Sequence, residues 1–449
     1  MLYKLHTNIL IVGVLTIGLM AVKVYDRAFS VMTFCSVISF ISQLCLLLYF
    51  SREKEATYSC KILFLTVLCY TLAMGGLLMG VSYYYDGDTF MFSKADAMFY
   101  YTHSMKFANY GVVKGFKYII HNFESDDWGA LLLDGVLMSI IPSKLFLNAF
   151  YTLIGTFSSV MLFKIGRHFM PESYTFLAAL GYSTSSYMLF FNCSFLKESA
   201  FVFFVISAVY FLYQSIACQS RASMAAAFLF IVIIVFFRPA VAAMLVVSIF
   251  TYYGIVLRKR AVSVFLYVVA AATFAVGMKS MMDIVESNTL GGDMDAVIAD
   301  TSNAAYSGGF NYFVSFFGAF LGPFPTLFNP PDAPPTPMGF LGAGLSYKLF
   351  LILPFWFGVF MAVKKWMIEL FPLIAFVLLE MIATAYVCAS LELRKVILHV
   401  PFMYILSSFG LYYWSKTTHS MRLYSWLNFA YAVGVLILWN VIRVKTSYD

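Results

Sequence analysis

The sequence predicts an all-α integral membrane protein, and three observations carry that prediction. Of the 449 residues, 62% are hydrophobic and 11% are charged, whereas soluble domains carry roughly 25% charged residues. Apolar runs near the length of one span recur along the whole chain, and about 20 such residues cross a hydrocarbon core. No soluble domain of ordinary size fits between these runs.

The apolar runs predict about thirteen transmembrane helices. Two further apolar pieces, 130–141 and 310–328, are short or are broken by Pro and Gly. We expect these two as interfacial or re-entrant segments on the external side. The expected spans are about 8–22, 29–50, 62–82, 144–163, 174–191, 199–214, 224–237, 240–257, 261–279, 344–363, 367–390, 397–415 and 423–442.

Charge indicates how these spans are oriented. With the N-terminus inside, several short loops rich in Lys and Arg fall on the inner side, in agreement with the positive-inside rule. Most of the 22 Asp and Glu residues then lie outside. An excess of carboxylates on one side is what an external catalytic or binding face would produce.

Two long external loops divide the chain. The first, 83–143, carries amphipathic helices, one of them expected at 93–110. The second, 280–345, begins acidic, continues aromatic and runs through GPFPTLFNPPDAPPTP, where the density of Pro excludes regular helix, so it is a candidate lid. The other parts are the N-terminal helices (1–82), the central helices (144–279) and the C-terminal helices (346–449).

The start of the first loop gathers carboxylates beside tyrosines. The stretch YYYDGDTFMFSKADAMFYYTH places Asp86, Asp88 and Asp96 just outside a span. A carboxylate at a membrane rim is costly unless it faces water or a partner, so these are candidates for a general base. Asp86 and Asp88 are also candidate ligands for a divalent cation, but DGD is common by chance, and we predict no metal or other cofactor. An ordinary solvated loop explains the same residues.

Other polar residues of this external face are candidates for binding substrate. Asp96, Tyr100 and His103 share one face of the expected helix 93–110 at helical spacing. A second acidic cluster near the end of the loop contains Asp127. The candidate substrate-binding residues are Asp86, Tyr100, His103, Asp127 and Glu198.

Cations from three separate turns fall in the same external plane. They are Lys197, Arg238 and the neighbouring pair Arg394 and Lys395. Each alone would anchor a helix at the interface or pair with one acid, whereas together they form a basic pocket. Arg suits phosphate because its planar fork donates bidentate hydrogen bonds. We expect these four residues to bind a lipid phosphate.

Several classes of site are disfavoured. The net charge of +7 reflects membrane orientation, and no stretch resembles a nucleic-acid-binding patch. The seven Cys are scattered without a CxxC pair, and the His residues lack HExxH spacing. Glu380 lies within an expected span, where a carboxylate is costly and usually partnered, so it is either a proton-relay residue or a neutral buried acid.

A series of loose motifs occurs in a specific order along 83–415. ADAMFYYTHSMKFA is followed by DDWGALLLDGVLMSIIPSKLFLNAF, LGYSTSSYMLFFNCSFLKESAFVF, FFRPA, GPFPTLFNPP and LELRKVILHVPFMYILSSFGL. This order resembles the polytopic C-superfamily (GT-C) glycosyltransferases, particularly bacterial family-39-like members found with polysaccharide assembly genes.

The resemblance implies a multi-pass enzyme of the bacterial cytoplasmic (inner) membrane whose active face is periplasmic. It implies transfer of sugar from a polyprenyl-phosphate sugar or a polyprenyl-diphosphate glycan, carried in membrane lipid, to a glycan, lipid or protein acceptor. Carried over, Asp96 would be the general base, with Asp88 in reserve. Arg394, with Lys395, Arg238 and Lys197, would hold the donor phosphate and stabilise the charge of the leaving group.

Two alternatives remain open. A repeat-unit polymerase for O-antigen or exopolysaccharide would also be polytopic, but it would favour an Arg-rich main loop, and the first loop here is richer in Asp than in Arg. A transporter or lipid flippase would instead rely on Glu380 and other intramembrane polar groups, while the external aspartates would tolerate change.

Overall fold

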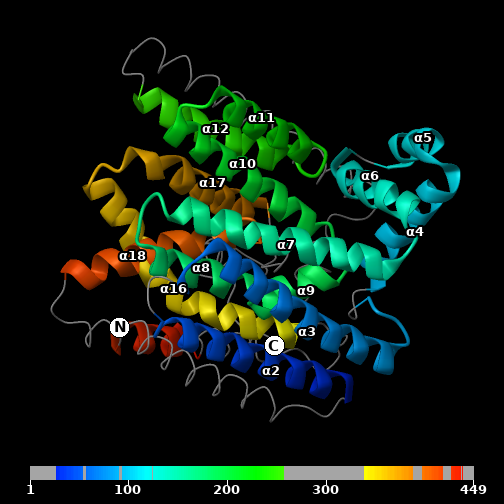
Figure 1. Cartoon of the computed structure of the whole chain (residues 1–449), viewed down its shortest axis with the longest axis horizontal. Helices are drawn as coiled ribbons and strands as arrows, with labels where there is room; N and C mark the ends of the chain where they lie inside the picture. Colours follow the sequence, from blue (N-terminus) through cyan, green and yellow to red (C-terminus); the bar gives the residue numbers. More distant parts are fainter. Residues whose placement is uncertain are drawn as a thin grey trace, which may run out of the picture.

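A computed structural model gives the fold of the chain (Figure 1). It describes residues 27–53, 57–90, 94–123, 125–256, 338–387, 397–417, 426–435 and 437. All regular structure in those ranges is helical, which confirms the all-α class. The expected spans 8–22 and 261–279, and the apolar piece 310–328, lie outside the described residues.

Four of the described helices are long and apolar enough to cross a membrane. This finding supports an integral membrane protein, although the expected number of about thirteen spans goes beyond it. The four stretches are Cys60–Tyr84, Lys144–Gly166, Glu198–Cys218 and Pro239–Val256. Shorter apolar helices accompany them at Ile38–Phe50, Arg221–Val235, Phe350–Lys364 and Trp426–Val435.

The first two helices of the described chain are α2 (Arg27–Phe50) and α3 (Cys60–Asp86). The Ser59 hydroxyl caps α3 by accepting a hydrogen bond from the Ile62 N–H at 3.3 Å. At its other end, α3 stops at Gly87, which has φ of 73° and donates its N–H to the Tyr83 carbonyl. Because this left-handed conformation favours glycine, the Gly of DGD determines where α3 ends.

Three short helices follow, which we call the helical cap: α4 (Lys94–Tyr110), α5 (Val112–Asn122) and α6 (Ser125–Ile140). The first matches the expected helix 93–110 closely, whereas the last begins five residues before the expected segment 130–141. The Phe107 ring is fully buried where the three helices meet. A Cβ added at Gly115 or Gly135 would lie 2.7 Å or 2.5 Å from that ring, so these two glycines let α5 and α6 pack closely around Phe107.

The central bundle contains one break that the sequence did not predict. The expected single span 174–191 is two helices, α8 and α9, separated at Thr184–Ser185. In the STSS stretch, the Thr184 hydroxyl donates to the Leu180 carbonyl, and the Ser185 hydroxyl accepts from the Met188 N–H. Such side-chain bonds compete with the helical ladder, which accounts for the break. The helices here are α7 (Lys144–Gly166), α8 (Glu172–Ser183), α9 (Ser186–Cys193), α10 (Glu198–Cys218), α11 (Arg221–Val235) and α12 (Pro239–Val256).

The C-terminal helices cross at a pair of glycines. A Cβ at Gly410 would lie 2.0 Å from the Pro354 carbonyl oxygen, and one at Gly358 would lie 2.3 Å from the Leu406 carbonyl oxygen. Small residues allow helix backbones to approach this closely. The helices are α16 (Met338–Lys364), the 3₁₀ turn η2 (Ile368–Leu370), α17 (Phe371–Val387) and α18 (Val400–Thr417). Because α16 begins at Met338, the last residues of the expected loop 280–345 are helical rather than irregular.

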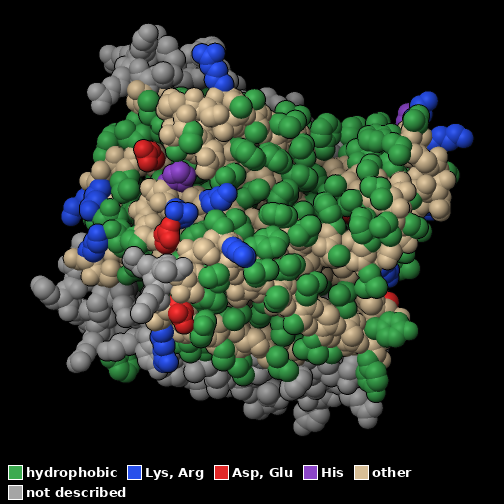
Figure 2. Space-filling view, viewed as in Figure 1, with side chains coloured by type: hydrophobic (Ala, Val, Ile, Leu, Met, Phe, Trp, Pro, Cys, Tyr) green, Lys and Arg blue, Asp and Glu red, His purple; other side chains and the backbone are tan. Residues whose placement is uncertain are grey.

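The two ends of the bundle differ in character. Figure 1 shows the helical cap at the right-hand end, next to the start of α7, with the turn after α7 at the opposite end. Figure 2 shows hydrophobic side chains over much of the face between the ends, and most of the Lys and Arg on its left-hand side. An apolar belt between charged ends is what a lipid-facing bundle requires.

Replacing Gly410 with Ala tests the close crossing of α16 and α18. The added Cβ has only backbone to meet, so we expect the helices to separate and the midpoint of thermal unfolding in detergent to fall by several degrees. Gly76→Ala in α3 is the matched control, because its Cβ meets nothing within 4 Å and the change removes a helix-weakening glycine. Equal midpoints for the two variants would contradict this packing.

Candidate functional site

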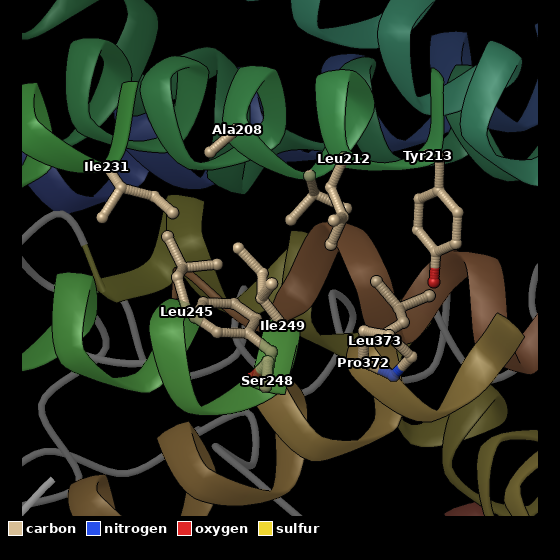
Figure 3. A pocket seen from close by; sticks show the side chains of 11 residues that line it. Ala208, Leu212, Tyr213, Ile231, Leu245, Ser248, Ile249, Pro372 and Leu373 are labelled. Carbon is tan, nitrogen blue, oxygen red and sulfur yellow. The ribbon is translucent and has the colours of Figure 1, made fainter. Parts of the chain in front are cut away.

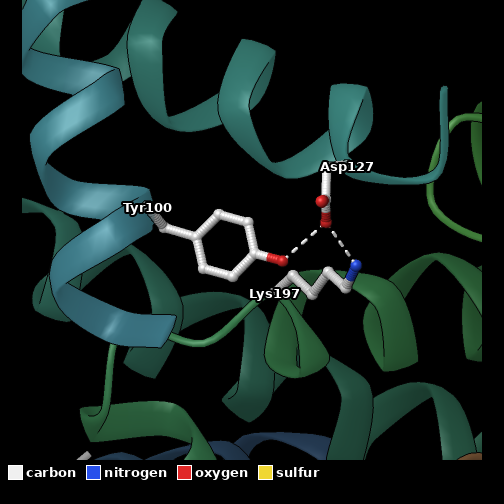
Figure 4. A network of polar contacts seen from close by, with 3 residues as sticks. All are labelled: Tyr100, Asp127 and Lys197. Atoms are coloured by element: carbon white, nitrogen blue, oxygen red, sulfur yellow. Dashed lines mark hydrogen bonds and ion pairs between the residues drawn. The ribbon is translucent and has the colours of Figure 1, made fainter. Parts of the chain in front are cut away.

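The most concentrated polar cluster at the cap end joins three helices. The Asp127 Oδ1 atom accepts a hydrogen bond from the Tyr100 hydroxyl at 2.7 Å and pairs with the Lys197 Nζ atom at 2.6 Å (Figure 4). Tyr100 belongs to α4, Asp127 to the first turn of α6, and Lys197 is the residue before α10. Three of the candidate residues are therefore brought together, although up to 97 residues separate them in the chain.

The cluster is only partly covered. The Lys197 side chain is 12% exposed and the Asp127 side chain 28% exposed. The Lys197 ammonium also lies 5.8 Å from the centre of the Tyr100 ring, a cation–π distance that adds attraction. Since partly buried charges are screened less than exposed ones, this ion pair constrains the position of Asp127 more than an exposed pair would.

A tight backbone contact places Asp127. The Gly129 N–H donates to the Phe236 carbonyl at 2.7 Å, which attaches the start of α6 to the end of α11. A Cβ at Gly129 would lie 2.3 Å from the Phe237 ring, so only glycine fits without a shift. The Trp128 ring stacks on Phe236 with centroids 6.5 Å apart. Asp127 thus precedes two anchored residues and is directed towards the start of α10.

Arg238 lies near the same helix start. Its guanidinium is 5.7 Å from the centre of the Phe201 ring, one turn beyond Lys197 on α10. Within the part of the chain that the structure describes, no carboxylate pairs with Arg238. The prediction that Arg238 and Lys197 act together stays a prediction, and Arg394 and Lys395 lie outside the described residues.

Glu198 is directed into the bundle. It is 3% exposed, and its Oε2 atom has no hydrogen-bond partner among the described residues. It lies within interaction range of the hydroxyls of Tyr151 in α7 and Tyr187 in α9. The predicted contact between Glu198 and substrate stays a prediction, and the side chain is buried rather than exposed beside the cluster.

Sequence reasoning missed a second carboxyl–tyrosine pair. The Tyr151 hydroxyl donates to Asp134 Oδ1 at 2.5 Å, and both side chains are buried. Burial raises the pKa of the Asp134 carboxyl from 3.8 to about 7, although the bond from Tyr151 opposes the rise. The available signal was spacing, since Asp134 follows Asp127 by two helical turns and so lies on the same side of α6.

Three further candidates of the first loop, Asp86, Asp88 and Asp96, lie between the end of α3 and the first turn of α4. Asp88 Oδ1 accepts from the Phe90 N–H at 2.8 Å, a local turn contact, and the Asp88 charge acts on Lys144. Asp86 ends α3 and Asp96 lies in the first turn of α4, but their side chains are outside the described part. Their predicted roles, as base or as cation ligands, stay predictions.

His103 belongs to an aromatic cluster on the outer part of the cap. Its Nδ1 atom is 2.7 Å from the Tyr118 hydroxyl, and its ring lies 4.6 Å from Phe99 and 4.7 Å from Phe123. Burial, with a smaller contribution from Lys106, lowers the pKa of His103. At neutral pH this imidazole is therefore mostly uncharged.

A buried acid–base pair lies in the C-terminal helices. Glu380 in α17 contacts His399, just before α18, through Oε2 and Nδ1. The two side chains are 4% and 0% exposed. The sequence expectation that Glu380 would be partnered is met, and the partner is a histidine 19 residues away.

An apolar pocket between α10, α11, α12 and α17 offers little chemistry. Figure 3 shows Leu212 and Tyr213 on one side of it and Leu245, Ser248 and Ile249 on the other. No charged side chain lines it. Among the described residues there is also no group of three His, Cys, Asp or Glu arranged to hold a metal ion.

A scan against models of protein families finds no match to this chain, and no curated protein matches its sequence.

The Asp134 pKa predicts a pH dependence of stability. Because the folded-state pKa is raised, the folded protein binds this proton more tightly, and the resulting stabilisation is lost as pH rises from about 4 through about 7. The loss is on the order of 4 kcal/mol as an upper bound. We expect the melting midpoint in detergent to fall more steeply with pH in the unmodified protein than in Asp134→Asn.

Glu172→Gln is the control, because Glu172 forms a half-exposed ion pair with Arg167 at 2.5 Å. It should keep the pH dependence of the unmodified protein. Parallel curves for Asp134→Asn and the unmodified protein would show that Asp134 is not the group responsible.

Proposed function

We propose that the chain is a membrane glycosyltransferase that moves a sugar from a polyprenyl-phosphate-linked donor to an acceptor at the external face. The observation that supports this most is the Tyr100–Asp127–Lys197 cluster at the cap end of the bundle. The same proposal includes about thirteen transmembrane helices in a GT-C-like arrangement and a location in the bacterial cytoplasmic membrane.

Asp127 has the geometry of a positioned base. Both of its contacts fall on Oδ1, and no contact of Oδ2 with another described residue is present. A carboxylate that is held through one oxygen and is partly exposed can present the other to an acceptor hydroxyl. Asp96, favoured by the resemblance, is the competing base, and Asp88 remains in reserve.

The proposed step transfers the sugar directly from the lipid-linked donor to the acceptor. The carboxylate takes the proton of the acceptor hydroxyl, and the oxygen of that hydroxyl forms a bond to the anomeric carbon of the donor. The bond from that carbon to the phosphate oxygen breaks, and the electron pair leaves with the polyprenyl phosphate. Arg238, with Arg394 and Lys395, would stabilise the charge on the departing phosphate, because guanidinium forms bidentate bonds to it.

Lys197 has a narrower role in this scheme than the sequence suggested. Its ammonium is engaged by Asp127 at 2.6 Å, so it orients the base and adds positive potential near the donor phosphate. A direct contact between Lys197 and the phosphate remains an expectation from the sequence.

Asp127→Asn tests the base directly. The amide keeps the size of the side chain but cannot take a proton, so we expect sugar transfer to fall about 10²–10⁴-fold. Because the change also weakens the ion pair with Lys197, we expect the melting midpoint to fall by a few degrees while the protein stays folded. The assay is transfer of radiolabelled sugar from a crude pool of polyprenyl-phosphate sugars by the purified protein, with and without chelator.

Asp96→Asn and Asp88→Asn are compared in the same assay, with Glu172→Gln, at the opposite end of the bundle, as the control. Loss of transfer in Asp96→Asn but not in Asp127→Asn would identify Asp96 in α4 as the base. Unchanged transfer in all three aspartate variants would exclude a mechanism in which one of these carboxylates acts as the base.

A transporter or lipid flippase is the second candidate, and the buried Glu380–His399 pair favours it. Paired carboxyl and imidazole groups inside a helical bundle are typical of proton relays. Alternatively, the Glu380–His399 pair is purely structural and only holds α17 against the start of α18. No feature of the described residues specifically favours a repeat-unit polymerase.

Glu380→Gln separates these functions. If the chain is a transferase, the variant should keep transfer, although it is less stable because the change weakens a buried charged contact. If the purified chain transfers no sugar, and Glu380→Gln abolishes movement of lipid or solute across reconstituted vesicles, the transporter replaces the transferase. The melting midpoint of the variant, measured in parallel, shows whether lost movement is simply lost folding.

A further inference from the structure

The second helix of the cap exposes an apolar face. In α5, Gly115 and Ile119 are buried against the rest of the cap. Val113 is 74% exposed, Ile120 46% and Phe116 38%. Residues at this spacing lie on one side of a helix, so α5 presents a continuous apolar strip away from the cap.

Positive charge borders this strip. Lys114 and Lys117 are exposed, and by helical spacing they lie along one edge of the apolar strip. From residue 97 to residue 123 the sequence contains three Lys and no Asp or Glu. The partner of this surface must therefore be apolar in one part and negatively charged in the other.

The cap lies at the level where the bundle ends. Its third helix begins against Phe236, in the turn between α11 and α12, through the Gly129 N–H and the Trp128 ring. Arg238 and Trp128 are residue types that mark the boundary between lipid and water. Figure 1 shows α5 on the outer side of α6, away from α10, α11 and α12, so the exposed strip does not face the bundle.

We propose that α5 is an interfacial helix that binds anionic phospholipid beside the bundle, with Val113, Phe116 and Ile120 in the acyl boundary and Lys114 and Lys117 at the phosphates. An exposed apolar strip beside lysines is the pattern by which helices lie in a membrane surface. Zwitterionic lipid satisfies the apolar strip alone, whereas anionic lipid satisfies the lysines as well. This surface is independent of the proposed sugar transfer.

The test places a photoreactive residue on the strip of the full chain. Val113→benzoylphenylalanine is reconstituted in vesicles of phosphatidylcholine mixed with phosphatidylglycerol and irradiated, and the α5 peptide is analysed by mass spectrometry. We expect lipid adducts at this position. Among them, phosphatidylglycerol should exceed its fraction in the vesicles about five-fold for each lysine that contributes. Asn122→benzoylphenylalanine is the control, because Asn122 is exposed on the opposite side of α5 and should give few lipid adducts.

Lys114→Gln combined with Lys117→Gln isolates the charge. It should keep the lipid adducts at Val113 but lose the enrichment of phosphatidylglycerol. Adducts to another segment of the chain or to a second copy would overturn the proposal, as would equal lipid labelling from Val113 and Asn122. Lipid adducts without any enrichment would overturn the anionic preference.

Discussion

The ion pair between Asp127 and Lys197 is the contact on which the arrangement of the cap end depends. It joins a helix of the first loop to the start of a membrane-spanning helix 70 residues later. The Gly129 N–H also attaches the start of α6 to the end of α11, two residues from Asp127. Tyr100 adds a third helix to the same carboxylate oxygen, so a shift of α4, α6 or α10 would disturb all three side chains together.

Close approach through glycine is the second recurring constraint. Gly115 and Gly135 accept the Phe107 ring inside the cap, Gly129 accepts Phe237, and Gly410 accepts a carbonyl of the neighbouring helix. In lipid there is little hydrophobic drive to hold helices together, so tight van der Waals packing at small residues has to supply much of the association. The polar cluster therefore rests on a packed scaffold rather than on the ion pair alone.

The helical class, the helix 93–110 and a helix over most of 130–141 were predicted from the sequence, whereas the helix expected to end near residue 82 continues to Asp86, so Asp86 is its last residue rather than part of a loop. Hydropathy, turn chemistry and helical spacing are local properties, and these predictions use only such properties. The break at Thr184–Ser185 was missed because hydropathy does not register hydroxyl bonds to the backbone. The pairing of Asp127 with Lys197 could not be predicted, since nothing in the residues between them specifies which helices meet. Asp134 was overlooked because a lone acid in an apolar segment has no motif, although its spacing from Asp127 was visible.

The placement of the cap against α10 and α11 also bears on the order of synthesis. The first loop emerges before the residues it finally contacts, since Lys197 and Phe236 are made well after α6 is complete. The cap therefore cannot dock fully until Lys144–Gly166 and Glu198–Cys218, two helices long and apolar enough to cross a membrane, have been made. Within the loop, Gly115 of α5 and Gly135 of α6 lie against the Phe107 ring of α4, so these three helices can begin to pack before the later helices are made. Packing around Phe107 before docking would keep the carboxylates of the loop away from the hydrocarbon while the bundle is still being assembled.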